Sequence, residues 1–236
     1  MPKDSDRTLV LCPGFMTDHG LWAEMKKGLE SLGRVQFADQ SQDSSFTDIA
    51  QRVLGAAPAQ FTLIGFSMGG YVAREVLRLA PGRVKGLVLI NTSARPETQD
   101  VARRNVNLTK VTQAQGFRGL STKALGNALH PSRQHDEQLI DALQQMALRM
   151  GEAAFLNQLA IVRKDDRPEL ADITCPTLVV WSRQDALRSL EEALELKDAI
   201  ANARLEIIED CGHLTPLEQP EKLLKILSGW LIDVGI

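Results

Sequence analysis

The chain has 236 residues, of which 44% are hydrophobic and 24% are charged, and its formal net charge at pH 7 is −3. This length suits one well-packed α/β domain and is short for two. The weakly negative charge gives no electrostatic reason to expect nucleic acid or an anionic membrane as a partner. The polar opening residues show no secretory signal, and no apolar run approaches the roughly 20 residues needed to span a bilayer.

The cysteines are few and isolated. Cys12, Cys175 and Cys211 are widely spaced and form no C-x-x-C pair. An odd number of separate cysteines argues against a disulfide framework or a zinc site. The sequence therefore predicts a protein of the reducing cytoplasm.

Short apolar runs typical of buried strands alternate with helical patterns along most of the chain. The expected strands are Thr8–Cys12, Val35–Ala38, Phe61–Ile64, Gly86–Ile90, Thr177–Trp181 and Leu205–Ile208. The expected helices are Gly20–Ser31, Phe46–Ala56, Gly70–Leu79, Leu187–Ile200 and Glu221–Ile232. This alternation predicts a mostly parallel sheet of about six strands, covered by helices on both faces. In such sheets, sites form in the loops at the carboxyl ends of the strands.

One stretch, from Arg95 to Leu170, breaks the alternation because it carries only helical patterns. These patterns cover Thr98–Ala114, Leu120–Leu129, Asp136–Met150 and Glu152–Val162. Inserted after the fourth strand, this stretch is expected to lie over the strand ends as a lid. The predicted organisation is a core of residues 1–94 and 171–236 with a helical cap of residues 95–170. Several apolar side chains of the cap are expected to pack it onto the core: Leu143, Met146, Met150, Phe155 and Leu159.

The segment from Gly65 to Gly69, with sequence GFSMG, lies between the third expected strand and the third expected helix. It places Ser67 at the apex of a tight turn. A serine hydroxyl becomes a useful nucleophile only when it is raised clear of the backbone beside a base. Side chains at the two glycines would collide with the neighbouring strand and helix. The motif alone would also fit a glycine-rich turn that holds a phosphate or merely packs, but the strand and helix around it favour a nucleophile.

A base for this serine is sought among the four histidines. Only His213 follows a strand, in a loop at the carboxyl end of Leu205–Ile208. His130 and His135 lie in the helical insertion, where we expect them to be solvated. His19 lies in the first loop, where contact with substrate is conceivable but a loop or helix-start role is favoured.

The base needs a carboxylate to fix its tautomer and to stabilise the imidazolium that forms. Asp185, just beyond the fifth expected strand, is the best candidate. Asp210 lies too close to His213 in sequence and is better suited to ending its strand. Asn91, at the end of the fourth strand, cannot supply a charge. The predicted order is therefore Ser67, Asp185, His213, each at the carboxyl end of a different strand.

Two N–H groups are needed for the negative oxygen that develops on an attacked carbonyl. Met68 offers one from the start of a helix, where the helix dipole also favours negative charge. Phe15 is expected to offer the second, from the loop after the first strand, where Gly14 lets the chain turn closely. The Pro-Gly dipeptide in this loop would by itself indicate no more than a turn. The side chains of four residues are expected to line an apolar pocket: Phe15, Met16, Met68 and Leu214.

Taken together, these elements resemble the α/β-hydrolase superfamily over nearly the whole chain. The matching segments are Leu9–Phe15, Gly65–Gly70, Trp181–Asp185, Gly212–His213 and Glu218–Glu221. The resemblance implies an α/β-hydrolase fold. Because about seven residues precede the first expected strand, the two leading antiparallel strands of larger members are expected to be missing. Relatives commonly have His-Gly where this chain has Pro-Gly. That histidine is not part of the triad, so Phe15 keeps its expected role.

The resemblance implies a serine hydrolase that cleaves a small or medium acyl ester through an acyl-enzyme, with no metal or cofactor. The same triad serves C–C bond hydrolases, lactonases, thioesterases, perhydrolases and hydroxynitrile lyases in the superfamily, and carboxylesterase is favoured only as the commonest outcome. Dehalogenases and epoxide hydrolases are disfavoured because they use aspartate where Ser67 stands. A small-molecule receptor on the same scaffold remains an alternative. The sequence does not indicate an oligomeric state.

Overall fold

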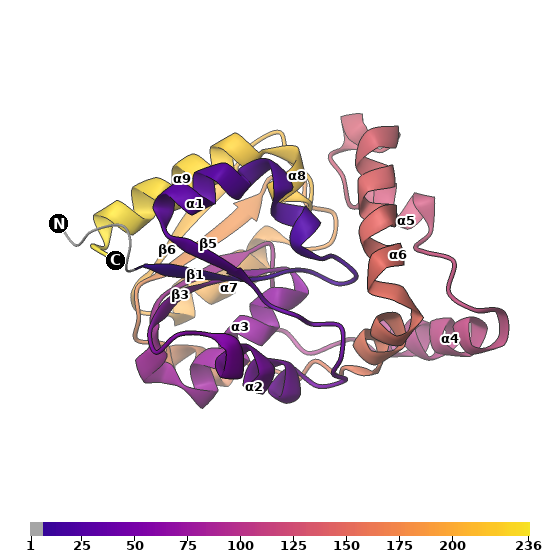
Figure 1. The fold of residues 1–236 in the computed structure, drawn as a ribbon, viewed down its shortest axis with the longest axis horizontal. Coiled ribbons are helices and arrows are strands. Elements are labelled where there is room, and N and C mark those ends of the chain that lie inside the picture. Colours follow the sequence, from indigo (N-terminus) through magenta and orange to yellow (C-terminus); the bar gives the residue numbers. More distant parts are fainter. Residues whose placement is uncertain (1–6) are drawn as a thin grey trace.

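Six parallel strands form one sheet in the computed structural model, which describes residues 7–236 (Figure 1). The strands are β1 (Thr8–Cys12), β2 (Arg34–Phe37), β3 (Phe61–Phe66), β4 (Val84–Ile90), β5 (Thr177–Ser182) and β6 (Ala203–Ile208). Their order across the sheet is β2-β1-β3-β4-β5-β6. The predicted α/β-hydrolase fold with a six-stranded parallel core is confirmed, and the strand ends differ from the expected ones by at most two residues.

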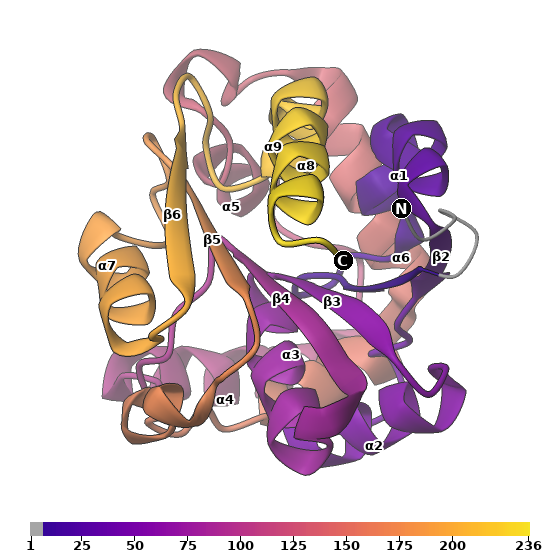
Figure 2. The same ribbon diagram turned by 90° about the vertical axis from the view of Figure 1, so that its left-hand side faces the viewer.

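Helices cover both faces of the sheet (Figures 1 and 2). One face carries the 3-10 helix η2 (His19–Met25), α1 (Lys26–Leu32) and α9 (Pro220–Asp233), which follows the short α8 (Thr215–Glu218). The other face carries α2 (Phe46–Ala56), α3 (Met68–Leu79) with the short η3 (Pro81–Arg83) after it, and α7 (Leu190–Ala199). The single helix expected over Gly20–Ser31 is therefore divided. Its first part is the 3-10 helix, whose start is capped by Asp18 Oδ1 accepting from the N–H of Gly20 at 2.8 Å.

Alternating side chains of each strand fill a hydrophobic core on either face of the sheet. In β1, Leu9 and Leu11 pack into the cluster beneath α1 and α9, which includes Trp230. Val10 and Cys12 pack into the cluster beneath α2 and α3. All four β1 side chains are fully buried. Inner parallel strands covered on both faces favour apolar residues at nearly every position, which explains why β1, β3, β4 and β5 read as nearly continuous apolar runs.

The helix expected over Leu187–Ile200 starts later because of its capping residues. Ser189 Oγ accepts from the N–H of Glu192, and Glu192 Oε2 accepts from the N–H of Ser189 at 2.8 Å, which completes a capping box. The turn before it is held by Asp185, whose Oδ1 accepts from the N–H groups two and three residues further on, at 2.7 and 3.0 Å. Asp185 thus lies outside the helix and keeps its second oxygen for another partner.

Residues 95–170, which we call the cap segment, lie between β4 and β5 and contain only helices. These are α4 (Gln99–Gln115), α5 (Thr122–Asn127), η4 (Pro131–Arg133), α6 (Glu137–Ala160) and η5 (Arg167–Asp172). In Figure 1, α4, α5 and α6 stand to one side of the sheet. Non-helical angles at Gly151 (φ 78°, ψ 178°) interrupt α6 where the sequence predicts a break between two helices. The division of the chain into core and cap subdomains stays a prediction.

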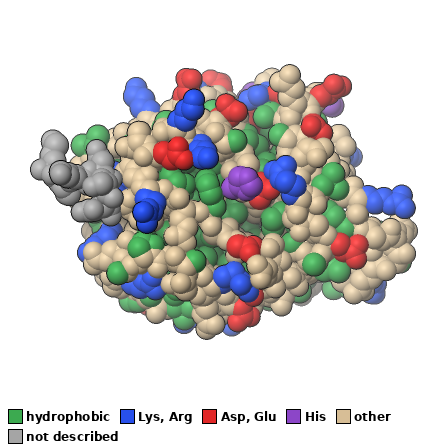
Figure 3. All heavy atoms as spheres, viewed as in Figure 1, with side chains coloured by type: hydrophobic (Ala, Val, Ile, Leu, Met, Phe, Trp, Pro, Cys, Tyr) green, Lys and Arg blue, Asp and Glu red, His purple; other side chains and the backbone are tan. Residues whose placement is uncertain are grey.

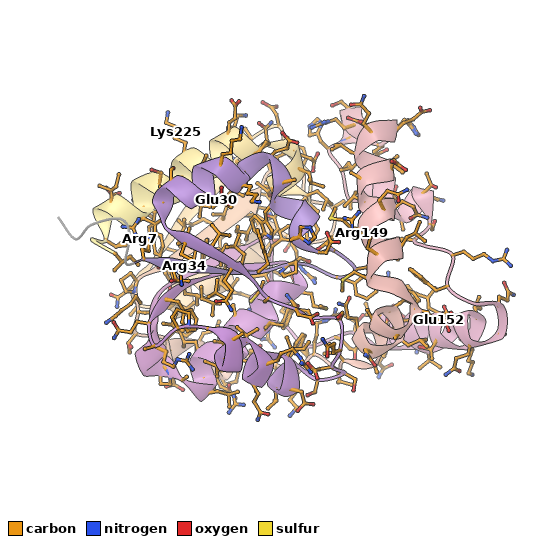
Figure 4. The ribbon with its side chains drawn as sticks, viewed as in Figure 1. Arg7, Glu30, Arg34, Arg149, Glu152 and Lys225 are labelled. Carbon is orange, nitrogen blue, oxygen red and sulfur yellow. The ribbon has the colours of Figure 1, made fainter. Side chains whose placement is uncertain are left out.

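Side chains of α6 fasten the cap segment to the core. Arg149 points from α6 towards the core (Figure 4), and its Nε lies 2.8 Å from Asp18 Oδ2. The buried amide of Gln158 accepts from the N–H of Met16 at 2.9 Å and donates to the carbonyl of Gln40 at 3.0 Å. The apolar residues expected to pack the cap are buried or half-buried in clusters: Leu143, Met146, Met150, Phe155 and Leu159.

The surface carries charges of both signs. Lys and Arg side chains are interspersed with Asp and Glu on the face shown in Figure 3. Many of them are paired, as Arg52 is with Asp43 at 2.7 Å and Arg183 with Glu209 at 2.8 Å. Within residues 7–236, none of the helices combines the length and the apolar character that crossing a membrane requires.

The turn between β3 and α3 tolerates only glycine at Gly69, which gives a test of the fold. A Cβ placed there would press against the carbonyl oxygen of Cys12 and would lie 2.5 Å from that of Pro13. Because backbone atoms cannot yield easily, we expect Gly69→Ala to lower the free energy of unfolding by about 1–3 kcal/mol in urea denaturation. The control is Gly55→Ala on the exposed side of α2, where a Cβ meets nothing within 4 Å. It should raise stability by about 0.5–1 kcal/mol, and equal stabilities for the two variants would contradict the close approach.

Candidate active site

Ser67 lies at the apex of the turn between β3 and α3, with φ 51° and ψ −113°. A non-glycine residue at positive φ costs about 1–3 kcal/mol and persists only where its surroundings hold it. The Ser67 N–H donates to the carbonyl of Ile90 at 2.9 Å, and its carbonyl accepts from Thr92 Oγ1 at 2.7 Å. A Cβ on Gly65 would lie 2.5 Å from the carbonyl oxygen of Gly69, so the turn closes only around glycine. These constraints raise the serine hydroxyl clear of the backbone.

The structure brings Ser67, His213 and Asp185 into one hydrogen-bonded row. His213 Nε2 lies 2.9 Å from Ser67 Oγ, and His213 Nδ1 lies 2.8 Å from Asp185 Oδ2. The Asp185 side chain is fully buried and that of His213 nearly so. An ionised carboxylate only accepts hydrogen bonds, so Nδ1 of a neutral imidazole carries the proton and Nε2 accepts from the serine hydroxyl. The arrangement is therefore able to take a proton from Ser67.

The other histidines and the second carboxylate lie elsewhere. His19 is the first residue of η2, and His135 is exposed on the cap segment. His130 caps η4 and shares a 2.8 Å hydrogen bond with a neighbouring serine. Asp210 is exposed after β6, in a left-handed conformation with φ 58°. Within residues 7–236, none of these side chains hydrogen-bonds to Ser67 or lines the cavity above it.

Asn91 has a structural part in the site that the sequence analysis missed. It is buried at the end of β4, and its Nδ2 lies 2.8 Å from the carbonyl of His213 and 2.7 Å from Thr215 Oγ1. Nδ2 also lies 3.0 Å from Ser182 Oγ, and Oδ1 accepts from the Ser182 N–H at 2.9 Å. One amide thus ties the ends of β4 and β5 to the loop that carries His213. Its place at the carboxyl end of a strand was the available signal, but an uncharged amide is not a candidate for the acid and so predicted no role there.

The loop of His213 is also bound to the cap segment. The His213 N–H donates to the carbonyl of Ala128 at 2.8 Å. The buried carboxylate of Glu218 accepts from the N–H of Leu214 at 3.1 Å and from the N–H of His130 at 2.7 Å. In the sequence, Glu218 is notable only as part of a segment that matches the superfamily, whereas in the structure its carboxylate joins the His213 loop to the cap segment.

The loop after β1 passes directly beside Ser67. A Cβ built on Gly14 would lie 3.5 Å from the Cβ of Ser67. The Gly14 carbonyl accepts from the Thr17 side chain at 3.1 Å, and in a trans peptide the N–H of Phe15 points the opposite way. The next N–H, that of Met16, is already bound to the cap. In the part of the chain that the structure describes, no hydrogen bond occupies the N–H of Phe15.

A cavity of about 210 Å³ opens above Ser67. Of the four side chains expected to line a pocket, Phe15 and Met68 lie at its wall. Met16 and Leu214 do not. The positive φ of Met16 (53°) accompanies a fully buried side chain in a cluster with the cap, and Leu214 is buried in the core beneath α9. The cavity is smaller than the about 300–1,000 Å³ of pockets for drug-sized ligands, which suits a small acyl group.

The cysteines near the strand ends are not reactive groups. Burial raises the pKa of the Cys12 thiol to about 12, and burial likewise raises the pKa of Cys211 to about 12. Cys175 is half-buried, and burial raises its pKa as well. Thiolates are the nucleophilic form of cysteine, so none of these groups competes with Ser67. Within residues 7–236, no three His, Cys, Asp or Glu side chains are grouped to hold a metal ion.

The raised thiol pKa values predict slow labelling of the folded protein. At pH 8, a pKa of about 12 leaves roughly one thiol in 10⁴ ionised. We therefore expect Ellman's reagent to label Cys12 and Cys211 only after unfolding, measured as absorbance with and without urea. All three cysteines should react in urea, which serves as the control. Rapid release of more than one equivalent of colour from the folded protein would contradict the assignment.

Comparison with known proteins identifies the family. The model of the alpha/beta hydrolase family matches residues 9–226. The chain belongs to this family. Among similar alpha/beta hydrolases, the pimeloyl-(acyl-carrier protein) methyl ester esterase of Photobacterium profundum is 26% identical over 94% of each chain. The 3-oxoadipate enol-lactonase 1 of Acinetobacter baylyi is 24% identical over 96% of this chain and 89% of its own.

A solved hydrolase structure agrees with the fold described above. An esterase from Thermogutta terrifontis superposes with a TM-score of 0.86 at 25% identity, covering 98% of this chain and 91% of its own. The family match and these relatives support hydrolase chemistry for this alpha/beta hydrolase.

Proposed function

We propose that this alpha/beta hydrolase is a serine esterase that cleaves a small or medium acyl ester through an acyl-enzyme on Ser67. The observation that carries the proposal is the row of hydrogen bonds from Asp185 through His213 to Ser67, which ends beneath a cavity. Two of its relatives bear the name esterase, which supports ester hydrolysis as the reaction.

In the proposed reaction, His213 takes the Ser67 proton as Oγ attacks the ester carbonyl, and Asp185 stabilises the imidazolium. The N–H groups of Phe15 and Met68 donate to the negative oxygen, and one such donor typically lowers the barrier by about 3–4 kcal/mol. Met68 begins α3, so its N–H has no acceptor within the helix. The imidazolium then protonates the leaving alcohol. Water activated by His213 attacks the acyl-enzyme, releases the acid and restores the serine.

Lactone hydrolysis is the second candidate. A lactone is a cyclic ester and needs the same nucleophile, base and oxyanion donors. One relative is named an enol-lactonase, and the cavity of about 210 Å³ suits a compact ring.

Rates on a chain-length series of p-nitrophenyl esters, matched thioesters and lactones would rank these reactions and would also detect a thioesterase. C–C bond hydrolysis and perhydrolysis are tested by adding a diketone substrate and by peroxide with a carboxylic acid.

The proposal includes a small-molecule substrate and a cytoplasmic location. Three unpaired cysteines, two of them buried, support a reducing compartment. No metal or cofactor takes part in the reaction as proposed, because protein groups supply the nucleophile, the base and the oxyanion donors.

Removing the nucleophile or the base tests the proposal directly. We expect a fluorophosphonate probe to label the wild-type protein with one equivalent, measured by intact mass. Ser67→Ala should abolish labelling, and His213→Ala should lower both labelling and ester turnover by about 10⁴-fold or more, because the serine is then no longer activated. A wild-type protein that never labels and turns over no ester of any chain length would instead favour a receptor.

The proposed role of Asp185 is tested by two matched aspartate variants. Asp185→Asn should lower kcat by about 10³–10⁴-fold, because an amide favours the wrong tautomer of His213. Asp210→Asn is the control, since Asp210 is exposed and its left-handed conformation suits asparagine. Steady-state rates on one p-nitrophenyl ester compare the two. Loss of activity in Asp210→Asn alone would show that Asp210, and not Asp185, supports His213.

A further inference from the structure

The charged side chains that line the cavity above Ser67 are all cationic. Arg104 on α4, Arg163 after α6 and Arg188 after β5 contribute to its wall, and no Asp, Glu or Lys does. The chain as a whole has 27 basic and 30 acidic residues, so its composition does not account for this bias. The remaining wall is largely apolar, with Phe15 and Leu159 among its side chains. The cavity therefore combines an apolar surface with positive charge.

The guanidinium of Arg163 lacks an acceptor. Within residues 7–236, it forms no hydrogen bond or ion pair, and its carbon lies 6.0 Å from the centre of the Tyr71 ring. Burial lowers the pKa of Arg163 below its ordinary value, and this effect outweighs the opposing one of Tyr71. Smaller contributions from nearby Arg188 and Arg104 also lower the pKa. Arg163 is half-buried, so its cation bears part of the cost of a charge that is removed from water without a partner. A bound anion would remove part of that cost.

Arg188 is also incompletely paired. Its Nε is buried with no hydrogen-bond partner in the described chain. Its Nη1 donates to the carbonyl of Leu187 at 3.4 Å and lies 3.6 Å from Glu192 Oε1. The other oxygen of the Glu192 carboxylate is bound in the α7 capping box. Arginines close by in sequence that lie outside this cavity have firmer partners: Arg95 lies 2.7 Å from Glu195, and Arg167 lies 2.6 Å from Asp165. Arg163 and Arg188 at the cavity thus keep N–H donors that no acceptor of the described chain uses.

A second cavity, of about 360 Å³, adjoins the first and shares Arg163 and Arg188 with it. Its wall also includes Asp185 and Glu192, whose carboxylates accept hydrogen bonds within the chain. These two arginines therefore lie where the cavities meet, whereas Ser67 lines only the first. A ligand that extends from Ser67 towards the second cavity would pass both guanidinium groups. The planar guanidinium matches the paired oxygens of a carboxylate or phosphate.

We propose that the natural ester carries an anionic group, a carboxylate or a phosphate, that binds Arg163 and Arg188 while its carbonyl lies at Ser67. The proposal rests on the esterase function proposed above. Short methylene spacers fit the apolar wall between the two ends. Arg104, exposed on α4, adds positive charge at the rim and favours the approach of an anion.

Three methyl esters with the same three-methylene spacer test this proposal in the wild-type protein. They are monomethyl glutarate, the neutral methyl 4-carbamoylbutanoate and methyl 4-phosphonobutanoate. We expect kcat/KM for one of the anionic esters to exceed that of the neutral amide at least about tenfold. A factor of this size is what one charge-assisted hydrogen bond contributes. The advantage should fall with added salt. The better anion identifies carboxylate or phosphate as the group recognised.

Two arginine variants and a matched control connect the preference to these residues. Arg163→Gln and Arg188→Gln should each lower the ratio of anionic to neutral kcat/KM about tenfold, mainly through KM. Lys164→Gln removes the same charge next to Arg163 from an exposed side chain that does not line the cavity, and it should keep the ratio. A ratio that falls equally in all three variants would overturn the proposal.

The outcome separates this inference from the proposed function. Equal kcat/KM for anionic and neutral esters in the wild-type protein would overturn the anion proposal and leave the esterase intact. Absence of any ester turnover and of fluorophosphonate labelling would overturn the esterase itself. Should the glutamine variants fail to fold, competitive inhibition of the wild-type protein by free glutarate but not by glutaramide supports the proposal. Equal inhibition by the two compounds would contradict it.

Discussion

The buried amide of Asn91 joins the end of β4, the end of β5 and the loop of His213, three segments that are distant in sequence. The row from Asp185 to Ser67 needs an imidazole held to within a fraction of an ångström, yet its backbone lies in a loop. Through Asn91, that loop takes on the rigidity of the central sheet. Each buried polar group left without its partner would cost about 1–3 kcal/mol, so the arrangement persists only when the whole network is satisfied.

Much of this fold was predictable because both faces of a parallel sheet are buried. Each inner strand is then a nearly continuous apolar run, and the helices between the runs follow from their period. Parallel strands also end at one edge, so side chains after β3, β5 and β6 can be expected to meet. That rule led from the sequence to Ser67, Asp185 and His213, which the structure places within hydrogen-bonding distance. Their catalytic roles remain proposals.

Other parts of the site depend on facts that sequence spacing does not contain. Asn91 was set aside because it lacks a charge, but its importance comes from acceptors supplied by residues 182–215. Met16 follows Phe15 directly, yet a positive φ and a hydrogen bond to the cap accompany its burial away from the cavity. The cationic wall is assembled from α4, the end of α6 and the loop after β5. Arg104, Arg163 and Arg188 are far apart in sequence, so no local sequence pattern predicts that they line one cavity.

Hydrogen bonds join the His213 loop and the Glu218 carboxylate to residues 128–130 of the cap segment. The cap segment therefore also helps to hold the loop that carries His213. A replacement for this segment would have to keep the Ala128 carbonyl and the His130 N–H. Otherwise the His213 loop would lose its hydrogen bond to Ala128 and its link through Glu218 to His130. In contrast, α4 has one buried residue, Thr112, and supplies Arg104 to the cavity. Divergence towards new substrates therefore has an open route through α4. The stretch after α5 is less free to change, because its backbone holds the loop that carries His213.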